Sequence, residues 1–173
     1  MLSPEEIAEF RLRHSPTADL LRSELRYFDC TAEEFKRLLD AREQGGNKVA
    51  TGDLVNRGPA TEQVRQLFGE ERAKQFEKTT DMYYQSARNG LEMTGQPVEL
   101  ADRAWEISRE ARTTAERLAK ESSLSVEERK QQLKGLRLET DRRLNELLGE
   151  KAARSVRQNL GVVLEVTEAN LKP

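Results

Sequence analysis

An all-α fold is predicted by three features of this 173-residue sequence. Charged residues make up 35% of the chain and aromatic residues 5%, and such a composition is typical of long, solvent-exposed helices. Apolar residues recur at intervals of three and four rather than alternating. Helix-capping signals precede most of these periodic stretches. Together these features predict about seven helices in an elongated bundle.

The N-terminal segment is predicted to form three helices. The first is expected from Pro4 to about His14, and the second begins at Pro16, because proline suits the first helical position. The third follows the N-cap Thr31 and ends at a Gly-Gly pair. We therefore expect residues 1–46 to be a three-helix segment.

A loop is predicted next, over residues 47–58, because this stretch (NKVATGDLVNRG) contains two glycines and few apolar residues. It leads into a helical body, residues 59–173, with which the N-terminal segment forms one continuous domain. In this body a helix restarts at Pro59. A further helix is expected from Glu70 to about Asn89, followed by a turn region at 89–96.

The dominant element is predicted to be an antiparallel hairpin of two long helices, residues 98–121 and 126–148, joined by the short link SSLS. The first helix carries a stripe of small residues, which lets a partner helix approach closely. The second carries a leucine-rich stripe. We expect these two stripes to face each other.

An internal repeat relates residues 64–76 to residues 144–156. Both match the pattern apolar-x-x-Leu-apolar-Gly-Glu-x-x-Ala-x-x-apolar, with Gly69 and Gly149 at the same position. Glycine ends one helix and glutamate starts the next. The sequence thus predicts a duplicated helix-Gly-helix unit. After the second copy a short helix is expected to about Leu160. The tail could be a docked terminal segment or a short strand, and helix or coil is the expectation.

Charge and cysteine content exclude several classes of protein. The net charge is −2 and the signs alternate along the chain, so no nucleic-acid footprint is predicted. A single cysteine excludes an internal disulfide framework. No apolar run approaches the length of a transmembrane helix, and residues 1–14 do not resemble a signal peptide. The chain is therefore expected to be soluble, and a signal or anchor upstream of Met1 stays open.

Catalytic chemistry has little support in the sequence. His14 is the single histidine, so a histidine-pair metal site is excluded. Cys30 and His14 could form a nucleophile and a base, but they fall in separate predicted helices. The acidic pairs at residues 5–6, 33–34 and 127–128 each fall in a first helical turn, where the helix dipole explains them. We predict no catalytic, cofactor-binding or metal-binding residue.

One aromatic cluster offers a candidate site for a partner. Met82, Tyr83 and Tyr84 concentrate apolar and aromatic surface, together with Trp105. They are interpreted either as core or as a surface for a protein or peptide, since Met and Tyr make adaptable contacts. The candidate partner-binding residues are Met82, Tyr83, Tyr84, Trp105, Arg109 and Arg112.

A short motif occurs twice, as LSPEE at residues 2–6 and LSVEE at 124–128, with a looser copy, CTAEE, at 30–34. Each copy places Ser or Thr at an N-cap and Glu three residues later, which is a capping box. The motif resembles the signature of the LTxxQ family of periplasmic helical proteins, which includes Spy-type chaperones. This resemblance implies an all-α, often dimeric protein that lacks a catalytic site.

A broader resemblance covers most of the chain. The stretches EFRLRHSPTADLLRSELRYFDCTAEEF, LLGEKAARSVRQ and SLSVEERKQQLKGLRLETDRRLNELLGE resemble uncharacterised exported or membrane-anchored bacterial helical proteins. This second resemblance implies an extracytoplasmic location and no particular activity.

The sequence leads to three hypotheses of function. The first is a non-enzymatic, chaperone-like binding protein that holds a protein or peptide partner on an amphipathic surface, outside the cytoplasm. The second is a structural or adaptor module that forms a homo-oligomer, such as a homodimer. The third and most distant is an enzyme that uses Cys30 or paired carboxylates.

Overall fold

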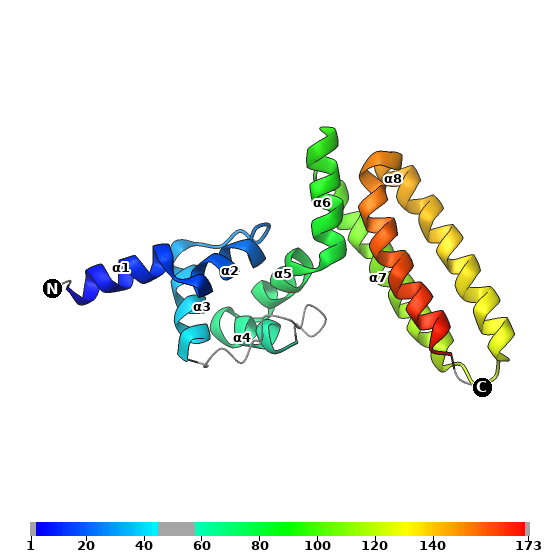
Figure 1. Ribbon diagram of the computed structural model, residues 1–173, viewed down its shortest axis with the longest axis horizontal. Coiled ribbons are helices and arrows are strands. Elements are labelled where there is room, and N and C mark those ends of the chain that lie inside the picture. Colours follow the sequence, from blue (N-terminus) through cyan, green and yellow to red (C-terminus); the bar gives the residue numbers. More distant parts are fainter. Residues whose placement is uncertain (1–2, 45–57, 172–173) are drawn as a thin grey trace. The chain divides into compact units, whose positions relative to one another are not determined.

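The chain folds entirely into helices over the part that the computed structural model describes, residues 3–44 and 58–171 (Figure 1). Eight helices and no strands occur in these ranges. They are α1 (Pro4–His14), α2 (Pro16–Glu24), α3 (Ala32–Gln44), α4 (Gly58–Phe68), α5 (Glu70–Thr80), α6 (Met82–Thr94), α7 (Leu100–Lys120) and α8 (Val126–Ala169). The all-α prediction is confirmed.

Contacts between residues divide the chain into two compact units, unit 1 (Met1–Asp81) and unit 2 (Met82–Pro173). The sequence predicts the division at a loop over residues 47–58, of which 47–57 lie outside the described residues. The new boundary has a physical reason, because α4 and α5 share one buried core with α2 and α3. Fully buried members of this core include Leu21, Leu38, Val64 and Phe76.

Three helices begin with capping boxes, as the repeated motif predicts. The Ser3 backbone N–H donates to the Glu6 carboxylate at 2.7 Å, and the Glu6 backbone N–H donates to the Ser3 hydroxyl at 3.2 Å. Thr31 and Glu34 make the same pair of bonds at the start of α3. Ser125 and Glu128 do so at the start of α8. The motif therefore marks helix starts.

The helix expected over residues 70–89 is broken at Asp81, which adopts an extended conformation with φ −66° and ψ 132°. Just before the break, the hydroxyls of Thr79 and Thr80 donate to the carbonyls of Gln75 and Phe76. Threonine and aspartate favour helices weakly, and such side-chain bonds to the backbone compete with helical structure. This break makes two helices, α5 and α6, out of the single helix expected there, whereas the two C-terminal helices expected on either side of Gly149 are counted together as α8.

The turn expected at residues 89–96 begins only at Gly95, which has φ 67°, because α6 continues to Thr94. Gly90, which suggests a turn in the sequence, lies inside the helix against the second half of α8. A Cβ atom at Gly90 would come 2.5 Å from the backbone oxygen of Ala152. Glycine is needed here for close packing of two helices and not for a chain reversal.

Unit 2 is built on α7 and the two halves of α8. The Arg129 guanidinium donates to the Ala119 carbonyl at 3.1 Å, and Arg143 pairs with Glu110 at 3.0 Å. Residue numbers fall along α7 as they rise along α8, so the two helices are antiparallel. The buried stripes are Ala101, Ala104, Ser108, Ala111, Ala115 and Leu118 on α7, and Leu133, Thr140, Leu144 and Leu148 on α8.

The two repeat glycines have nearly the same backbone conformation. Gly69 has φ 87° and ψ 177°, and Gly149 has φ 72° and ψ 160°. These positive φ values favour glycine. Gly149 divides α8 into a first limb, residues 126–148, and a second limb, residues 150–169. The second limb continues beyond Leu160, where the sequence expected it to end, because Leu160, Gly161 and Leu164 are buried.

Candidate binding surface

The residues predicted to bind a partner lie at different depths in unit 2. Tyr83 and Tyr84 are buried, with exposed fractions of 2% and 5%, whereas Met82 is 45% exposed. The Arg112 guanidinium lies 4.4 Å from the centre of the Tyr83 ring. Tyr83 and Tyr84 therefore belong to the interior, and Met82 presents apolar surface at the start of α6.

Trp105 and Arg109 form a second pair on α7. Trp105 is half-buried, and the guanidinium of the exposed Arg109 lies 4.8 Å from its ring centre. A cation over an indole ring is an attractive contact that also covers apolar surface. The pair thus shields part of the aromatic surface that the sequence analysis considered for a partner.

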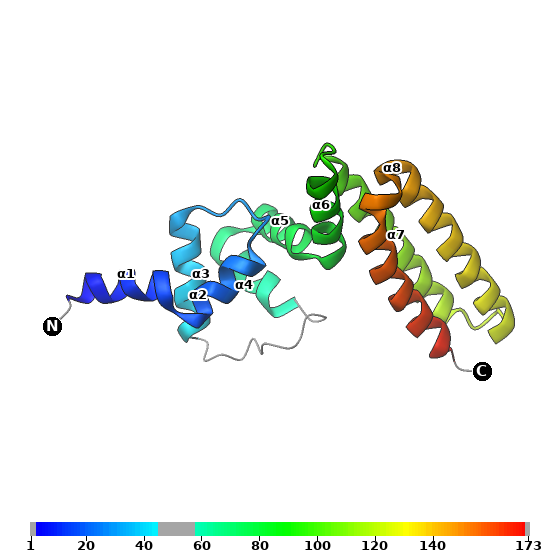
Figure 2. The ribbon, with the colours of Figure 1, turned by 45° about the horizontal axis from the view of Figure 1, so that its top comes forward.

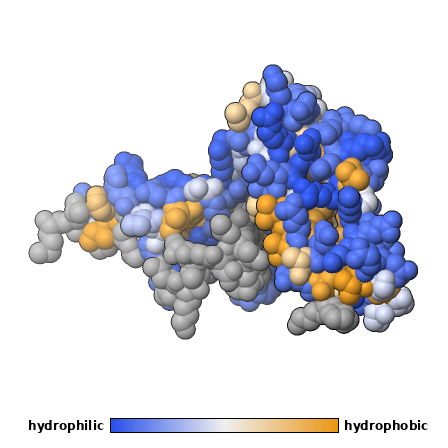
Figure 3. All heavy atoms as spheres, turned by 45° about the vertical axis from the view of Figure 1, so that its right-hand side comes forward, coloured by the Kyte–Doolittle hydropathy of each residue, from blue (hydrophilic) through white to orange (hydrophobic). Residues whose placement is uncertain are grey.

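A more exposed apolar surface lies on the second limb of α8. Val162, Val163 and Val166 are 56%, 37% and 54% exposed. We name this surface the valine face. Figure 3 shows apolar surface gathered on unit 2 near the C-terminal end of the chain. The sequence predicts helix or coil for this tail, and a coil would not place the valines on one face. Because the tail is helical to Ala169, Val162 and Val166, which are four residues apart, lie on the same side of the helix.

The valines are exposed because α6 is short and lies against the beginning of the second limb, around Ala152 and Asn159. Gly90 packs on Ala152, and the Asn159 amide donates to the Ser86 hydroxyl at 2.9 Å. Val163 and Val166 follow Asn159 by about one and two turns on the same side of the helix. Figures 1 and 2 both show this end of α8, in red, beside the end of α7 and away from α6.

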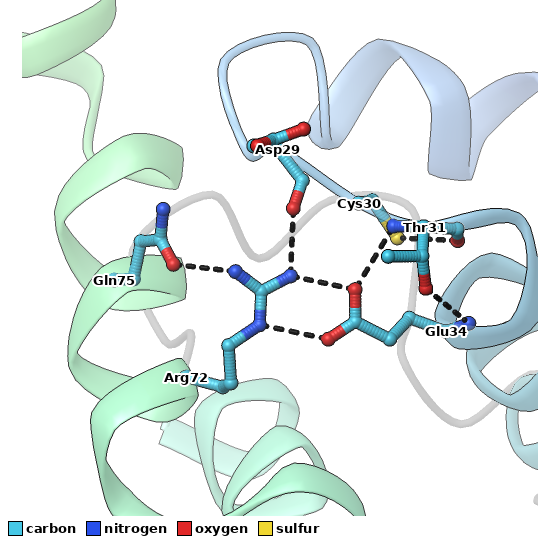
Figure 4. A network of polar contacts seen from close by, with 6 residues as sticks. All are labelled: Asp29, Cys30, Thr31, Glu34, Arg72 and Gln75. Atoms are coloured by element: carbon cyan, nitrogen blue, oxygen red, sulfur yellow. Dashed lines mark hydrogen bonds and ion pairs between the residues drawn. The ribbon is translucent and has the colours of Figure 1, made fainter.

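Cys30 lies in a polar network of unit 1 (Figure 4). Arg72 is at its centre and donates to both carboxylate oxygens of Glu34, at 2.8 and 2.7 Å, and to the Asp29 carbonyl at 2.7 Å. It also bonds Gln75 and lies 4.2 Å from the Phe28 ring centre. Arg72 therefore ties α5 to the segment that connects α2 and α3.

This environment keeps the Cys30 thiol protonated. Burial, assisted by the Glu34 carboxylate, raises the pKa of Cys30 to about 11. Burial also raises the pKa of Glu34, but hydrogen bonds from Arg72 and Thr31 outweigh it, so the net pKa lies below the ordinary value. A thiol must ionise to act as a nucleophile. The network fits a structural connection between helices better than a thiol catalyst.

A charged groove of about 450 Å³ lies between α7 and the first limb of α8. Ile107 and Leu147 contribute apolar surface to it. Charged side chains of both signs complete its lining: Arg103, Glu106, Glu110, Arg143 and Glu146. Because the two signs alternate, the groove has no dominant charge that would select an anion or a cation.

Comparison with protein-family models, curated protein sequences and solved structures finds no match to this chain. Within residues 3–44 and 58–171, no helix combines the length and the apolar character that a membrane crossing requires. The same residues hold no cluster of three His, Cys, Asp or Glu side chains suited to a metal ion. The valine face is the candidate site that geometry favours, because three valines of one helix are exposed together there.

Proposed function

We propose that this chain is a non-enzymatic, chaperone-like binding protein that holds a protein or peptide partner on the valine face of unit 2. The observation that carries the proposal is the exposure of Val162, Val163 and Val166 together on one continuous helix. Clustered exposed apolar side chains on a soluble domain are typical of interaction sites.

The size of this surface favours a weak and reversible contact. Complete burial of an exposed valine contributes roughly 1.5 kcal/mol, and the three valines are already about half-buried. Their burial would thus contribute on the order of 2 kcal/mol in total. Such a contribution suits transient holding of a client, for which the rest of the affinity comes from surrounding contacts.

The resemblance to the LTxxQ family supports the same proposal. That family is periplasmic and includes chaperones without a catalytic site, so the proposed location is extracytoplasmic. The raised pKa of the Cys30 thiol also favours this function over the third hypothesis, a thiol enzyme.

The proposal is tested by aggregation of a model client, reduced α-lactalbumin, followed by light scattering. We expect the protein to slow aggregation, and the double variant Val162→Ser/Val166→Ser to lose most of this effect. Leu138→Ser is the matched control, because Leu138 is 64% exposed but lies on the first limb of α8. Absence of protection at molar excess of the unmodified protein would exclude the chaperone-like function.

A structural module that forms a homo-oligomer is the second candidate, and α1 provides its specific support. Ile7 and Phe10 are 46% and 59% exposed, one helical turn apart. This candidate predicts a mass above that of the monomer in multi-angle light scattering, which falls to the monomer mass in Phe10→Ser. A monomer mass for the unmodified protein over a wide concentration range would exclude it.

A further inference from the structure

We infer that the second limb of α8 is exchangeable between two copies of this chain. In the exchanged dimer Gly149 becomes helical and α8 runs straight, so that each second limb packs on the α6, α7 and first limb of the other copy. Exchange of an identical element between copies is a low-cost route to a dimer. The inference goes beyond the proposed function, because it does not involve the valine face.

The hinge between the two limbs is a single residue. Both limbs are helical up to Gly149, whose φ of 72° and ψ of 160° reverse the chain, and Figures 1 and 2 both show this reversal in the orange part of α8. The limbs lie antiparallel: Arg157 donates to the Asn145 side chain at 2.6 Å, and Arg137 pairs with Glu165. The backbone angles at the hinge are accessible essentially to glycine alone.

The local sequence favours one continuous helix through the hinge. α8 begins at a capping box, whereas a glycine has no side chain that could cap the start of the second limb. The residues around the hinge, NELLGEKAA, are mostly strong helix formers. In the hairpin the Leu148 carbonyl accepts a bond from the Gln96 side chain at 3.0 Å. In a straight α8 the same carbonyl would accept from the Ala152 N–H, as in any helix.

Packing, by contrast, keeps the second limb folded back in a single copy. Ala153, Val156 and Leu160 are at most 1% exposed, and opening of the hinge in a monomer would return them to water. A second copy removes this cost, because its own opened unit 2 offers the same surface. Exchange thus re-forms the contacts of the hairpin between copies and alters the hinge alone. Short hinges under strain invite such an exchange.

The test places the two sides of the contact between the limbs in different molecules. One chain carries Cys30→Ser/Asn145→Cys and the other carries Cys30→Ser/Arg157→Cys, so each has a single cysteine. The two chains are unfolded together in urea, refolded at high concentration and treated with a short bismaleimide. Exchange brings the two cysteines side by side, so we expect a covalent dimer on a denaturing gel. Neither chain refolded alone should give one.

A hinge variant and its control measure what Gly149 contributes. A Cβ atom at Gly149 would meet the Gln96 side chain at an ordinary 3.7 Å, so Gly149→Ala strains the reversed backbone without a clash. We expect it to raise the association constant of the dimer, measured by light scattering after refolding, about a hundredfold or more. Gly135→Ala, within the first limb, should leave this constant unchanged. Phe10→Ser should also leave it unchanged, which separates the exchange from association through α1.

Three results would overturn the inference. The first is the absence of a cross-linked dimer in the refolded mixture of the two chains. The second is equal cross-linking in each chain alone, which would mean that copies associate through an outer surface. The third is a folded Gly149→Ala variant that dimerises no more strongly than Gly135→Ala. Circular dichroism checks the helix content of both variants, and if Gly149→Ala does not fold, the mixture of chains with the natural hinge decides. Suppression of client aggregation by the monomer is independent of all three.

Discussion

At the scale of single residues, Arg72 illustrates how unit 1 is held together. Its guanidinium bonds to Glu34, Gln75 and the Asp29 carbonyl, and it stacks on Phe28. The side chains of Arg72 and Glu34 are 24% and 17% exposed, so solvent screens their ion pair only in part. A planar guanidinium carries five N–H donors in a rigid fork that can bond a carboxylate through two parallel bonds, whereas an ammonium group carries three donors on a compact point charge.

We predict that Arg72→Lys lowers the free energy of unfolding of unit 1 by about 2 kcal/mol, because charge-assisted bonds to Glu34 and Asp29 are lost. Chemical denaturation followed by circular dichroism measures this change. Arg65→Lys is the matched control. Arg65 also pairs with two glutamates, Glu62 and Glu70, but is 40% exposed, so solvent screens these pairs and the loss in Arg65→Lys should be clearly smaller than in Arg72→Lys. Equal losses in the two variants would contradict this role for Arg72.

A second prediction concerns the reactivity of Cys30. Its pKa is raised from 9.0 to about 11, so the thiolate fraction at pH 8 falls about 100-fold relative to an unshifted thiol. Alkylation by iodoacetamide should therefore be about 100-fold slower in the native protein than in urea. Because ionisation requires loss of the thiol proton, the native rate should rise steadily from pH 8 to pH 10. A native rate equal to the unfolded rate would show that the thiol is not shifted.

At the scale of helices, the packing of neighbours decides where elements continue and where they break. α6 passes through Gly90 because that residue contacts Ala152, although the local sequence suggests a turn. The break at Asp81 falls where unit 1 ends and unit 2 begins. A glycine can therefore either end a helix or allow a close helix contact, and the residue type alone does not tell which.

Two glycine substitutions should therefore have opposite effects. Gly90→Ala should destabilise unit 2, because overpacking costs about 1–3 kcal/mol and outweighs the gain of about 1 kcal/mol in helix propensity. Gly135→Ala, where nothing lies within 4 Å of the added methyl group, should stabilise α8 by up to about 1 kcal/mol. Thermal denaturation of the two variants measures this contrast. Stabilisation by Gly90→Ala would show that α6 and α8 can separate without loss.

At the scale of the whole molecule, the division into two units predicts separable responses to mutation. The single tryptophan, Trp105, lies in unit 2, so its fluorescence reports on that unit. Gly90→Ala should increase amide hydrogen exchange in α6, α7 and α8 and leave α2 to α5 unchanged. Arg72→Lys should do the reverse. Increased exchange throughout the chain in either variant would mean that the two units unfold as one.

The sequence predicted the elements where the signal is local. The capping boxes at Ser3, Thr31 and Ser125, and the glycines at 69 and 149, act through bonds and backbone angles within a few residues. The small-residue stripe of α7 and the leucine stripe of α8 follow from helical periodicity. The candidate surface was harder to predict, since Tyr83 and Val166 are both apolar residues on helices, and only their neighbours decide which one is buried.

The sequence by itself therefore determined the all-α class, the positions of most helix starts and the antiparallel partner of α7, because these depend on local geometry and periodicity. The tertiary structure decided the boundary at Asp81, the continuation of α6 through Gly90 and the exposure of the valine face. Each of these depends on which helix lies against which. Whether a side chain is buried depends on the residues that pack against it. Those neighbours come from distant parts of the chain, and only the folded structure shows which they are.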